Sequence, residues 1–328
     1  MMIDSNVWRY AVIAVLLVAL EQVYFRIADR FNIVDKPNER SSHKRITIRG
    51  GGIIALFGVW LYAAFFGVEY PWFLVGLTLI AAISFVDDVR PVPNRYRIVV
   101  HFAAILLLFY ELGILCSAMW LWVVPAWVVC TGIINAYNFM DGINGITGAY
   151  SLAVLVPLFL LDSSMGFVDV NLIGVSMVAV LIFCFYNFRR KAKCFAGDVG
   201  AVSIAFIVLF LLGSLMVASG KVWYLLFLAV YGVDSILTIV HRLILRENIF
   251  KAHRKHLYQL LANELKVSHT VVAGGYALVQ LAISLGMIYL PIAPAIYFFA
   301  VVAVLSVVYV LVKKRYYHLH EEYLKTVK

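Results

Sequence analysis

The sequence contains few charged residues and few cysteines, and each shortage narrows the class of protein. Only 14% of the 328 residues are charged, whereas 64% are hydrophobic and the mean hydropathy is +0.93. This composition excludes an ordinary water-soluble globular domain. The four cysteines form no C-x-x-C pair, so neither a zinc site nor a disulfide framework is indicated. We therefore expect an integral membrane protein.

The amino-terminal residues lack the features of a cleaved signal peptide. The run MMIDSN has no positive n-region, and the first cluster of positive charge follows the first apolar run instead. We expect that run to be retained as the first membrane span, with its amino end outside.

The apolar stretches predict an all-α membrane fold. Most are about 16 to 20 residues long, which suits spanning helices rather than the shorter strands of a membrane barrel. We predict eleven spans in a single polytopic domain, residues 1–328, with a periplasmic N-terminus and a cytoplasmic C-terminus. The predicted spans are 7–25, 51–68, 71–86, 98–115, 118–134, 146–162, 171–187, 201–219, 222–240, 271–290 and 295–312.

Positive charge is concentrated on one predicted face of the membrane. Of the 27 lysines and arginines, 25 lie in the segments that this topology places together: 26–50, 87–97, 135–145, 188–200, 241–270 and the tail from Lys313. By the positive-inside rule this face is cytoplasmic. On this topology, the net charge of +9 lies mainly at the inner membrane surface and suits anionic ligands there. Nucleic acid is not an expected partner.

The run IINAYNFMDGINGITG, residues 133–148, is the most informative polar stretch. Its polar side chains recur at every third residue, at Asn135, Asn138, Asp141 and Asn144. Glycines follow with the same spacing and allow a ligand to approach the backbone. The run therefore predicts a ligand site at the end of a membrane span. The alternative is a polar turn between two helices.

The first predicted cytoplasmic loop combines cations with three consecutive glycines at the mouth of the second span. His43, Lys44 and Arg49 precede or adjoin this glycine run. Lys44, Arg49 and the glycine N–H groups together suit an anion clamp. A stop-transfer charge cluster explains the cations equally well, but it does not explain the glycines.

Two adjacent carboxylates, Asp87 and Asp88, end the third predicted span. Carboxylates at this depth are costly unless a cation or water meets them. On a helix they point about 100° apart, so we expect two different roles rather than one bidentate site. The alternative is a salt bridge to Arg95 or Arg97.

The loop after the seventh span carries four cations, Lys193 among them, followed by Gly-Asp198-Val-Gly. The cations suit phosphate groups. Asp198 lies between glycines where a span begins, which is more typical of a metal or phosphate position than of a surface residue. A turn is the alternative, since turns favour the same residues.

The ninth span contains Asp234, which we expect to pair with Arg242 or His241 or to face the polar site. The long segment that follows contains His253, Arg254 and His256. Its two histidines would share a helical face at i, i+3. Because no third ligand lies near them, they indicate a cationic phosphate contact rather than a zinc site.

Taken together, these motifs resemble the polyprenyl-phosphate N-acetylhexosamine 1-phosphate transferase family. The resemblance covers about residues 35 to 260 and four ordered motifs. It implies transfer of a sugar 1-phosphate from a UDP-N-acetylhexosamine to undecaprenyl phosphate with release of UMP, on the cytoplasmic side of the bacterial inner membrane. It also implies Mg²⁺ or Mn²⁺. A homodimer is left open, and so are the sugar, the polysaccharide pathway and the choice between single and double displacement.

Two departures from the family pattern distinguish its branches. Ile46 replaces a proline that is common after the basic pair of the first loop. The late loop lacks the consecutive histidines of the phospho-MurNAc-pentapeptide transferases. The resemblance therefore favours the branch that initiates O-antigen and capsule synthesis, with the peptidoglycan enzyme as the alternative. A transporter of an anionic solute or lipid is the alternative from another class.

The resemblance also assigns roles to residues. It points to Asn138 and Asp198 as the metal ligands and to Asp87, Asp88 and Asp141 as catalytic residues. The residues expected to bind substrate are His43, Lys44, Arg49, Arg95, Asn135, Asn144, Lys193, His253, Arg254 and His256.

Overall fold

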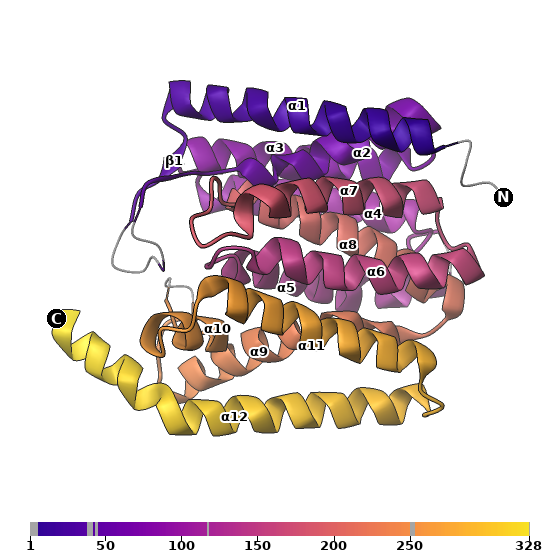
Figure 1. Ribbon diagram of the computed structural model, residues 1–328. Coiled ribbons are helices and arrows are strands. Elements are labelled where there is room, and N and C mark those ends of the chain that lie inside the picture. The colour runs from indigo at the N-terminus through magenta and orange to yellow at the C-terminus, as the bar shows by residue number, and fades with distance from the viewer. Residues whose placement is uncertain (1–5, 38–41, 43–44, 117, 250–252, 328) are drawn as a thin grey trace.

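A computed structural model describes residues 6–37, 42, 45–116, 118–249 and 253–327, with side chains up to Tyr323. The chain forms a bundle of long helices that run side by side, with the two ends of the chain at opposite ends of the bundle (Figure 1). Its helices are α1 (Val7–Phe31), η1 (Gly51–Ile53), α2 (Ile54–Phe66), α3 (Pro71–Val89), α4 (Asn94–Glu111), η2 (Ala118–Trp122), α5 (Val123–Met140), α6 (Ile146–Met165), α7 (Val170–Asn187), α8 (Gly197–Ser219), η3 (Val222–Leu228), α9 (Ala229–Ile244), α10 (Leu257–Gln259), the π-helical η4 (Leu260–Glu264), α11 (His269–Tyr289) and α12 (Pro294–Val327).

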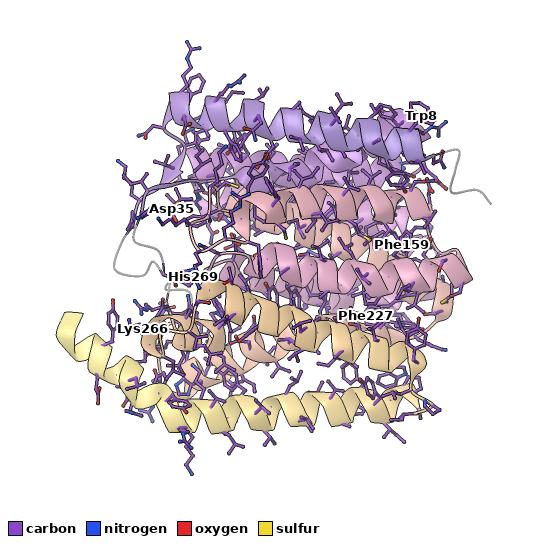
Figure 2. All side chains as sticks on the ribbon, viewed as in Figure 1. Trp8, Asp35, Phe159, Phe227, Lys266 and His269 are labelled. Carbon is purple, nitrogen blue, oxygen red and sulfur yellow. The ribbon has the colours of Figure 1, made fainter. Side chains whose placement is uncertain are left out.

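The strands are short. β1 (Val34–Asp35) pairs antiparallel with β2 (Thr47–Ile48), and Ile48 also bridges to Cys194 in the loop before α8. These contacts hold the loop between α1 and α2 against the loop between α7 and α8. The two loops therefore meet at the same end of the bundle, where Asp35, Lys266 and His269 also lie, whereas Trp8 lies at the opposite end (Figure 2).

The all-α membrane fold predicted from the sequence is confirmed. Every predicted span corresponds in order to a helix, and among the described residues nine helices are long and apolar enough to cross a membrane. The second span corresponds to the shorter apolar helix Gly51–Phe66, and α4 carries Arg95, Arg97 and Glu111 near its ends. The number of crossings and the side on which each end lies stay predictions.

Several predicted span ends are wrong. α5 continues to Met140, so Asn135 and Asn138 lie on its last turns and the predicted loop 135–145 shrinks to residues 141–145. α12 continues to Val327, although its predicted span stopped at residue 312. Both errors have one cause: hydropathy detects the apolar part of a helix, whereas backbone hydrogen bonding continues into polar sequence.

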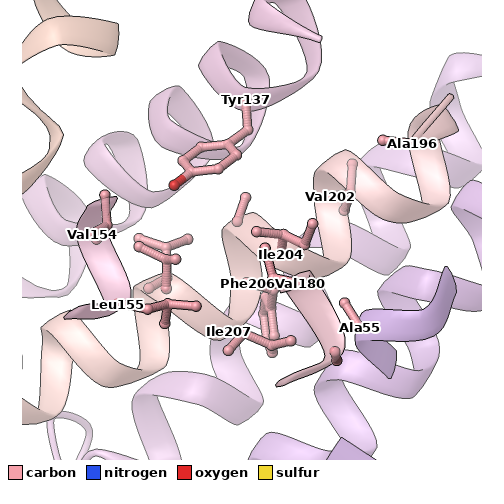
Figure 3. Close-up of a cluster of buried hydrophobic side chains, with 14 of the residues drawn as sticks. Ala55, Tyr137, Val154, Leu155, Val180, Ala196, Val202, Ile204, Phe206 and Ile207 are labelled. Atoms are coloured by element: carbon pink, nitrogen blue, oxygen red, sulfur yellow. The ribbon is translucent and has the colours of Figure 1, made fainter. Parts of the chain in front are cut away.

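α8 is the central helix of the bundle. It is buried along most of its length, and its side chains Ile204, Phe206 and Ile207 pack among residues of α2, α6 and α7 (Figure 3). Phe73 of α3 stacks on Phe206, with ring centroids 6.0 Å apart. In a membrane, close packing rather than exclusion of water holds helices together. The packing therefore fixes the start of α8, where Asp198 lies.

Candidate active site

Three carboxylates and two guanidinium groups form an alternating chain at one end of the bundle. Arg49 joins Asp88 (Nε to Oδ1, 2.6 Å) to Asp198 (Nη2 to Oδ1, 3.1 Å). Arg97 joins Asp198 (Nη2 to Oδ2, 3.5 Å) to Asp87 (Nη1 to Oδ2, 2.8 Å). Opposite charges at these distances compensate the cost of placing carboxylates near the membrane. The predicted salt bridge of the acidic pair is thus made by Arg97.

The two neighbouring aspartates have different partners. The Asp88 side chain is fully buried, and its two oxygens accept the N–H groups of Asp198 and Val199 at 2.9 Å each. It therefore caps the start of α8, where the helix dipole also favours a negative charge. Asp87 instead accepts the N–H of Val92 at 2.7 Å and remains partly exposed. Asp88 therefore positions Asp198, whereas the Asp87 side chain is 12% exposed and pairs with Arg97.

The glycines of the first loop serve close packing, and the predicted anion clamp is wrong for two of them. The N–H groups of Gly51 and Gly52 donate to the carbonyls of Phe195 and Ala196. A Cβ on Gly52 would lie 2.4 Å from the Cα of Gly200. These glycines allow the first loop to pack directly on the start of α8, and this contact places Arg49 beside Asp198.

Two residues at the end of α5 complete the polar cluster: Asn138 on its last turn and Asp141 directly after it. The Asn138 side chain hydrogen-bonds the Asp198 carboxylate. Asp141 follows the last residue of α5 and accepts a hydrogen bond from Thr147 (Oγ1 to Oδ1, 2.6 Å). Burial raises the pKa of Asp141 to about 7. The pair predicted as metal ligands, which is sixty residues apart in the sequence, is therefore in contact.

A cavity of about 380 Å³ opens beside this cluster. It is lined by Asp35, Ser42, Arg49, Asn138, Asp141, Gly142, Ile143, Asn144, Asn187, Phe195, Gly197, Asp198 and Gln259. The lining combines carboxylates, amides and a guanidinium group within one space. Such a set suits a phosphorylated ligand together with a hard cation.

Two asparagines fix the turn between α5 and α6. Asn187 accepts the N–H of Gly145 at 2.7 Å and donates to the Cys194 carbonyl at 2.8 Å. Asn144 donates to the Arg189 carbonyl at 2.8 Å. These bonds tie the central run to the loop before α8. The predicted residue Asn144 thus lines the cavity while its amide group is engaged with the backbone.

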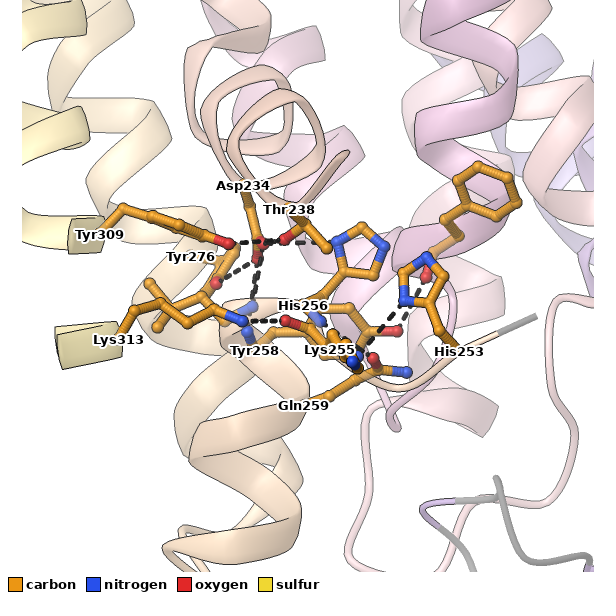
Figure 4. A network of polar contacts seen from close by, with 12 residues as sticks. Asp234, Thr238, His253, Lys255, His256, Tyr258, Gln259, Tyr276, Tyr309 and Lys313 are labelled. Carbon is orange, nitrogen blue, oxygen red and sulfur yellow. Dashed lines mark hydrogen bonds and ion pairs between the residues drawn. The ribbon is translucent and has the colours of Figure 1, made fainter. Parts of the chain in front are cut away.

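The late segment is folded around Asp234, and the partners predicted for Asp234 are wrong. Instead of Arg242 or His241, Asp234 contacts His256 (Oδ1 to Nδ1, 3.3 Å) (Figure 4). His256 is 2% exposed and precedes α10, so the predicted helical i, i+3 arrangement with His253 is also wrong. The two rings still stack, with centroids 5.0 Å apart. Burial and the neighbouring His256 lower the pKa of His253 to about 3, so His253 is neutral here.

The remaining predicted substrate residues lie away from the cavity or outside the described residues. Arg95 is exposed and contacts Tyr96, Asn135 is exposed on α5, and Lys193 lies over Phe25. Arg254 pairs with Glu264 (3.2 Å) and lines a second cavity of about 450 Å³ between the late segment and α12. His43 and Lys44 lie outside the described residues.

Three residues of the site were not among those predicted to bind substrate or metal or to act in catalysis. Arg97 bridges Asp87 and Asp198, Asn187 braces the central turn, and Gln259 of α10 lines the cavity. Arg97 carried a detectable signal, since it follows the acidic pair within one motif. Gln259 carried none, because only the folded late segment brings it to the cavity.

A divalent metal ion fits the chemistry of the cluster. In the part of the chain that the structure describes, no three His, Cys, Asp or Glu side chains form a group that could hold a metal ion by themselves. Mg²⁺ however takes oxygen ligands and is commonly held by one or two carboxylates plus substrate phosphates and water. Asp198 offers carboxylate oxygens and Asn138 an amide oxygen at the same cavity.

The bundle and its polar cluster define a polytopic membrane protein whose site suits phosphorylated substrates. The family model for glycosyl transferase family 4 matches residues 70–219, which include Asp87, Asp88, Asn138, Asp141 and Asp198. The chain is similar to this family over that region, which is 150 of its 328 residues.

Curated relatives agree with this similarity. The chain is 24% identical over 288 residues, 79% of each chain, to a probable undecaprenyl-phosphate N-acetylglucosaminyl 1-phosphate transferase of Bacillus subtilis. It is 26% identical over 261 residues, 72% of this chain and 71% of the relative, to an undecaprenyl-phosphate alpha-N-acetylglucosaminyl 1-phosphate transferase of Yersinia pestis. It is 34% identical over 113 residues, 34% and 32% of the two chains, to a phospho-N-acetylmuramoyl-pentapeptide-transferase of Deinococcus radiodurans.

Replacement of the two late histidines is expected to have unequal effects on stability. His256→Ala removes a buried ring that contacts Asp234, so it should lower the free energy of unfolding by about 2 to 4 kcal/mol. His253→Ala removes a half-buried ring and should cost less than about 1 kcal/mol. Thermal unfolding of the two variants in the same detergent measures the difference. Equal melting temperatures would show that His256 is not part of the packed structure.

Proposed function

We propose that the protein transfers N-acetylhexosamine 1-phosphate from a UDP-sugar to undecaprenyl phosphate and releases UMP. The observation that carries this proposal is the alternating chain of Asp87, Arg97, Asp198, Arg49 and Asp88 beside the polar cavity. The names of the curated relatives support the same acceptor and the same type of transfer. The positively charged end of the bundle supports a site at the cytoplasmic face of the bacterial inner membrane.

The chemistry of the transfer follows from the substrates. An oxygen of the lipid phosphate attacks the sugar-bearing phosphorus of the UDP-sugar, and the bond to the bridging oxygen breaks, so that UMP leaves with that oxygen. A phosphate monoester is already largely ionised near neutral pH, since its second pKa is about 6. The acceptor therefore needs alignment more than it needs a base.

The side chains of the cluster supply this alignment. Arg49 and Arg97 are partly exposed, so both can turn a guanidinium edge towards phosphate oxygens. Mg²⁺, held by Asp198 and Asn138, would neutralise the diphosphate and improve UMP as a leaving group. Asp87 is then the group that orients the attacking phosphate.

The surroundings of the aspartates support direct displacement over a phospho-enzyme. Asp87 pairs with Arg97 and accepts the Val92 N–H, and both contacts reduce the nucleophilicity of its carboxylate. Burial raises the pKa of Asp141 to about 7, which reduces the ionised fraction that could attack. A single in-line displacement is therefore the proposed course of the reaction.

The positions of the aspartates and the lengths of the matches also distinguish the two alternatives, a transporter and the peptidoglycan enzyme. A transporter is expected to carry its ionisable residues near the middle of the membrane in broken helices. Here Asp87, Asp88 and Asp198 lie at helix ends. The match to the peptidoglycan enzyme covers about a third of the chain, whereas the matches to the N-acetylglucosaminyl 1-phosphate transferases cover more than two thirds. These features favour an enzyme that acts on a simple UDP-N-acetylhexosamine and initiates a cell-surface polysaccharide such as O-antigen or capsule.

A donor panel tests the proposal. The purified protein is incubated with undecaprenyl phosphate, Mg²⁺ and one of several UDP-N-acetylhexosamines or UDP-MurNAc-pentapeptide, and UMP release is measured. We expect UMP from at least one UDP-N-acetylhexosamine and none when inorganic phosphate replaces the lipid, because the prenyl chain provides the binding energy. Release of UMP only from the pentapeptide donor would identify the peptidoglycan reaction. No release from any donor would contradict an enzyme of this type.

A further inference from the structure

Asp234 is a buried carboxylate of α9 that lies outside the region matched by the family model. It is 3% exposed. Its two oxygens are surrounded by donors from three different parts of the chain. The contacts are Leu257 N (2.9 Å), Tyr258 N (3.3 Å), His256 Nδ1 (3.3 Å), Tyr276 Oη (2.8 Å) and Thr238 Oγ1 (3.2 Å).

This set of donors shows what Asp234 holds. A buried charge within an apolar helix is costly, and it is retained only where hydrogen bonds compensate it. Two of the donors are backbone N–H groups of α10, so the position of that short helix depends directly on the carboxylate. Tyr276 approaches from α11, and Thr238 also contacts Tyr309 of α12 at 2.8 Å (Figure 4). Asp234 therefore connects α10 with α9 and α11.

The position of α10 matters because α10 forms one wall of the cavity. Gln259 lines the cavity, and Tyr258 donates to the Phe139 carbonyl at 2.8 Å. A Cβ on Gly142 would lie 2.2 Å from the Tyr258 hydroxyl, so that ring packs directly on the turn. Phe139 and Gly142 adjoin Asn138 and Asp141. A displacement of α10 would thus reach the two residues that face Asp198.

We propose that Asp234 is a positioning residue for the reaction, which acts through α10 and Tyr258 on the geometry of Asn138 and Asp141. The inference rests on the proposed function, because that function places Asn138 at the metal ion beside the UDP-sugar diphosphate, and Asp141 lines the same cavity. Asp234 itself touches no substrate. Its effect should therefore fall on the use of the donor and leave the binding of the prenyl chain unchanged.

The test measures steady-state kinetics of Asp234→Asn, Tyr258→Phe and the double variant with the UDP-sugar found active in the donor panel. Asparagine keeps the shape of the side chain but replaces one acceptor by a donor. We expect kcat/KM for the donor to fall roughly 10- to 100-fold in Asp234→Asn, while the KM for undecaprenyl phosphate stays within about twofold. Tyr258→Phe should fall roughly 3- to 10-fold. The kcat/KM of the double variant should be only slightly lower than that of Asp234→Asn alone, because both substitutions disturb the same contacts through α10 and Tyr258.

Controls separate positioning from general loss of structure. Thr238→Val removes a hydroxyl of α9 itself that touches Asp234 but leaves the contacts of Asp234 to both α10 and α11, so its donor kinetics should stay within about threefold of the wild type. Tyr276→Phe removes one donor to Asp234 and provides a milder variant if Asp234→Asn does not fold. It should raise the KM for the donor selectively, and an unchanged KM would overturn the proposal.

Three further results would overturn the inference. These are losses that multiply in the double variant, equal increases in KM for both substrates, and wild-type kinetics of a folded Asp234→Asn protein. They differ from a failure of the proposed function, in which the wild-type protein itself would release no UMP from any UDP-sugar.

Discussion

Replacement of Asp198 by asparagine is expected to reduce turnover at least ~100-fold and to raise the Mg²⁺ concentration needed for half-maximal activity. The change removes one negative charge from the oxygen pair that contacts Asn138, and a hard cation depends on that charge. It also leaves Arg49 and Arg97 each with one carboxylate instead of two. UMP release measured over a series of Mg²⁺ concentrations gives both quantities.

Asp162→Asn is the matched control. Asp162 accepts the N–H groups of Phe167 and Val168 in the loop after α6, far along α6 from the turn that contains Asp141. It should leave the Mg²⁺ requirement unchanged. If Asp198→Asn retained the wild-type Mg²⁺ requirement, the metal would be held elsewhere, and Asp87 and Asp88 would be the next carboxylates to test.

The sequence was sufficient for the fold wherever an apolar run determines a helix. α8 illustrates this, since every residue of its mostly hydrophobic stretch from Val199 to Leu212 is buried. Helix ends were less predictable. The chain leaves α5 only after Met140, where Asp141 and Gly142 interrupt the helix. This places Asn138 on a rigid helix instead of a loop, which hydropathy could not show.

The aspartates and Arg49 of the candidate site were predictable, but the pairing of Arg97 was not. Arg95 and Arg97 are two residues apart, so on a helix they point about 200° from each other. A prediction that began the fourth span at residue 98 could not tell which one faces Asp87, and α4 begins at Asn94. The partners of Asp234 were predicted wrongly for a related reason. Two of the actual partners are backbone N–H groups, which carry no signal in the sequence.

Removal of the guanidinium group by Arg49→Met is expected to lower the free energy of unfolding by about 3 to 5 kcal/mol. Arg49 is the charged side chain that pairs with Asp88 at 2.6 Å, and the Asp88 side chain is fully buried. After the substitution, the two backbone N–H groups at the start of α8 still donate to Asp88, but these groups carry only partial positive charge. The shift of the thermal unfolding midpoint in detergent measures the effect, and UMP release should fall with it because Asp198 loses the same partner.

The cause of the loss can be tested through Asp88. If the uncompensated charge is responsible, Arg49→Met combined with Asp88→Asn should be more stable than Arg49→Met alone, because the neutral amide costs less to bury. Arg49→Lys should lie between the wild type and Arg49→Met, since lysine keeps the charge but cannot bridge two carboxylates with a fork. Arg45→Met, in an exposed part of the same loop, should leave the unfolding midpoint unchanged. Equal midpoints for Arg45→Met and Arg49→Met would mean that Asp88 is stabilised without Arg49, and the alternating chain would then contribute to catalysis alone.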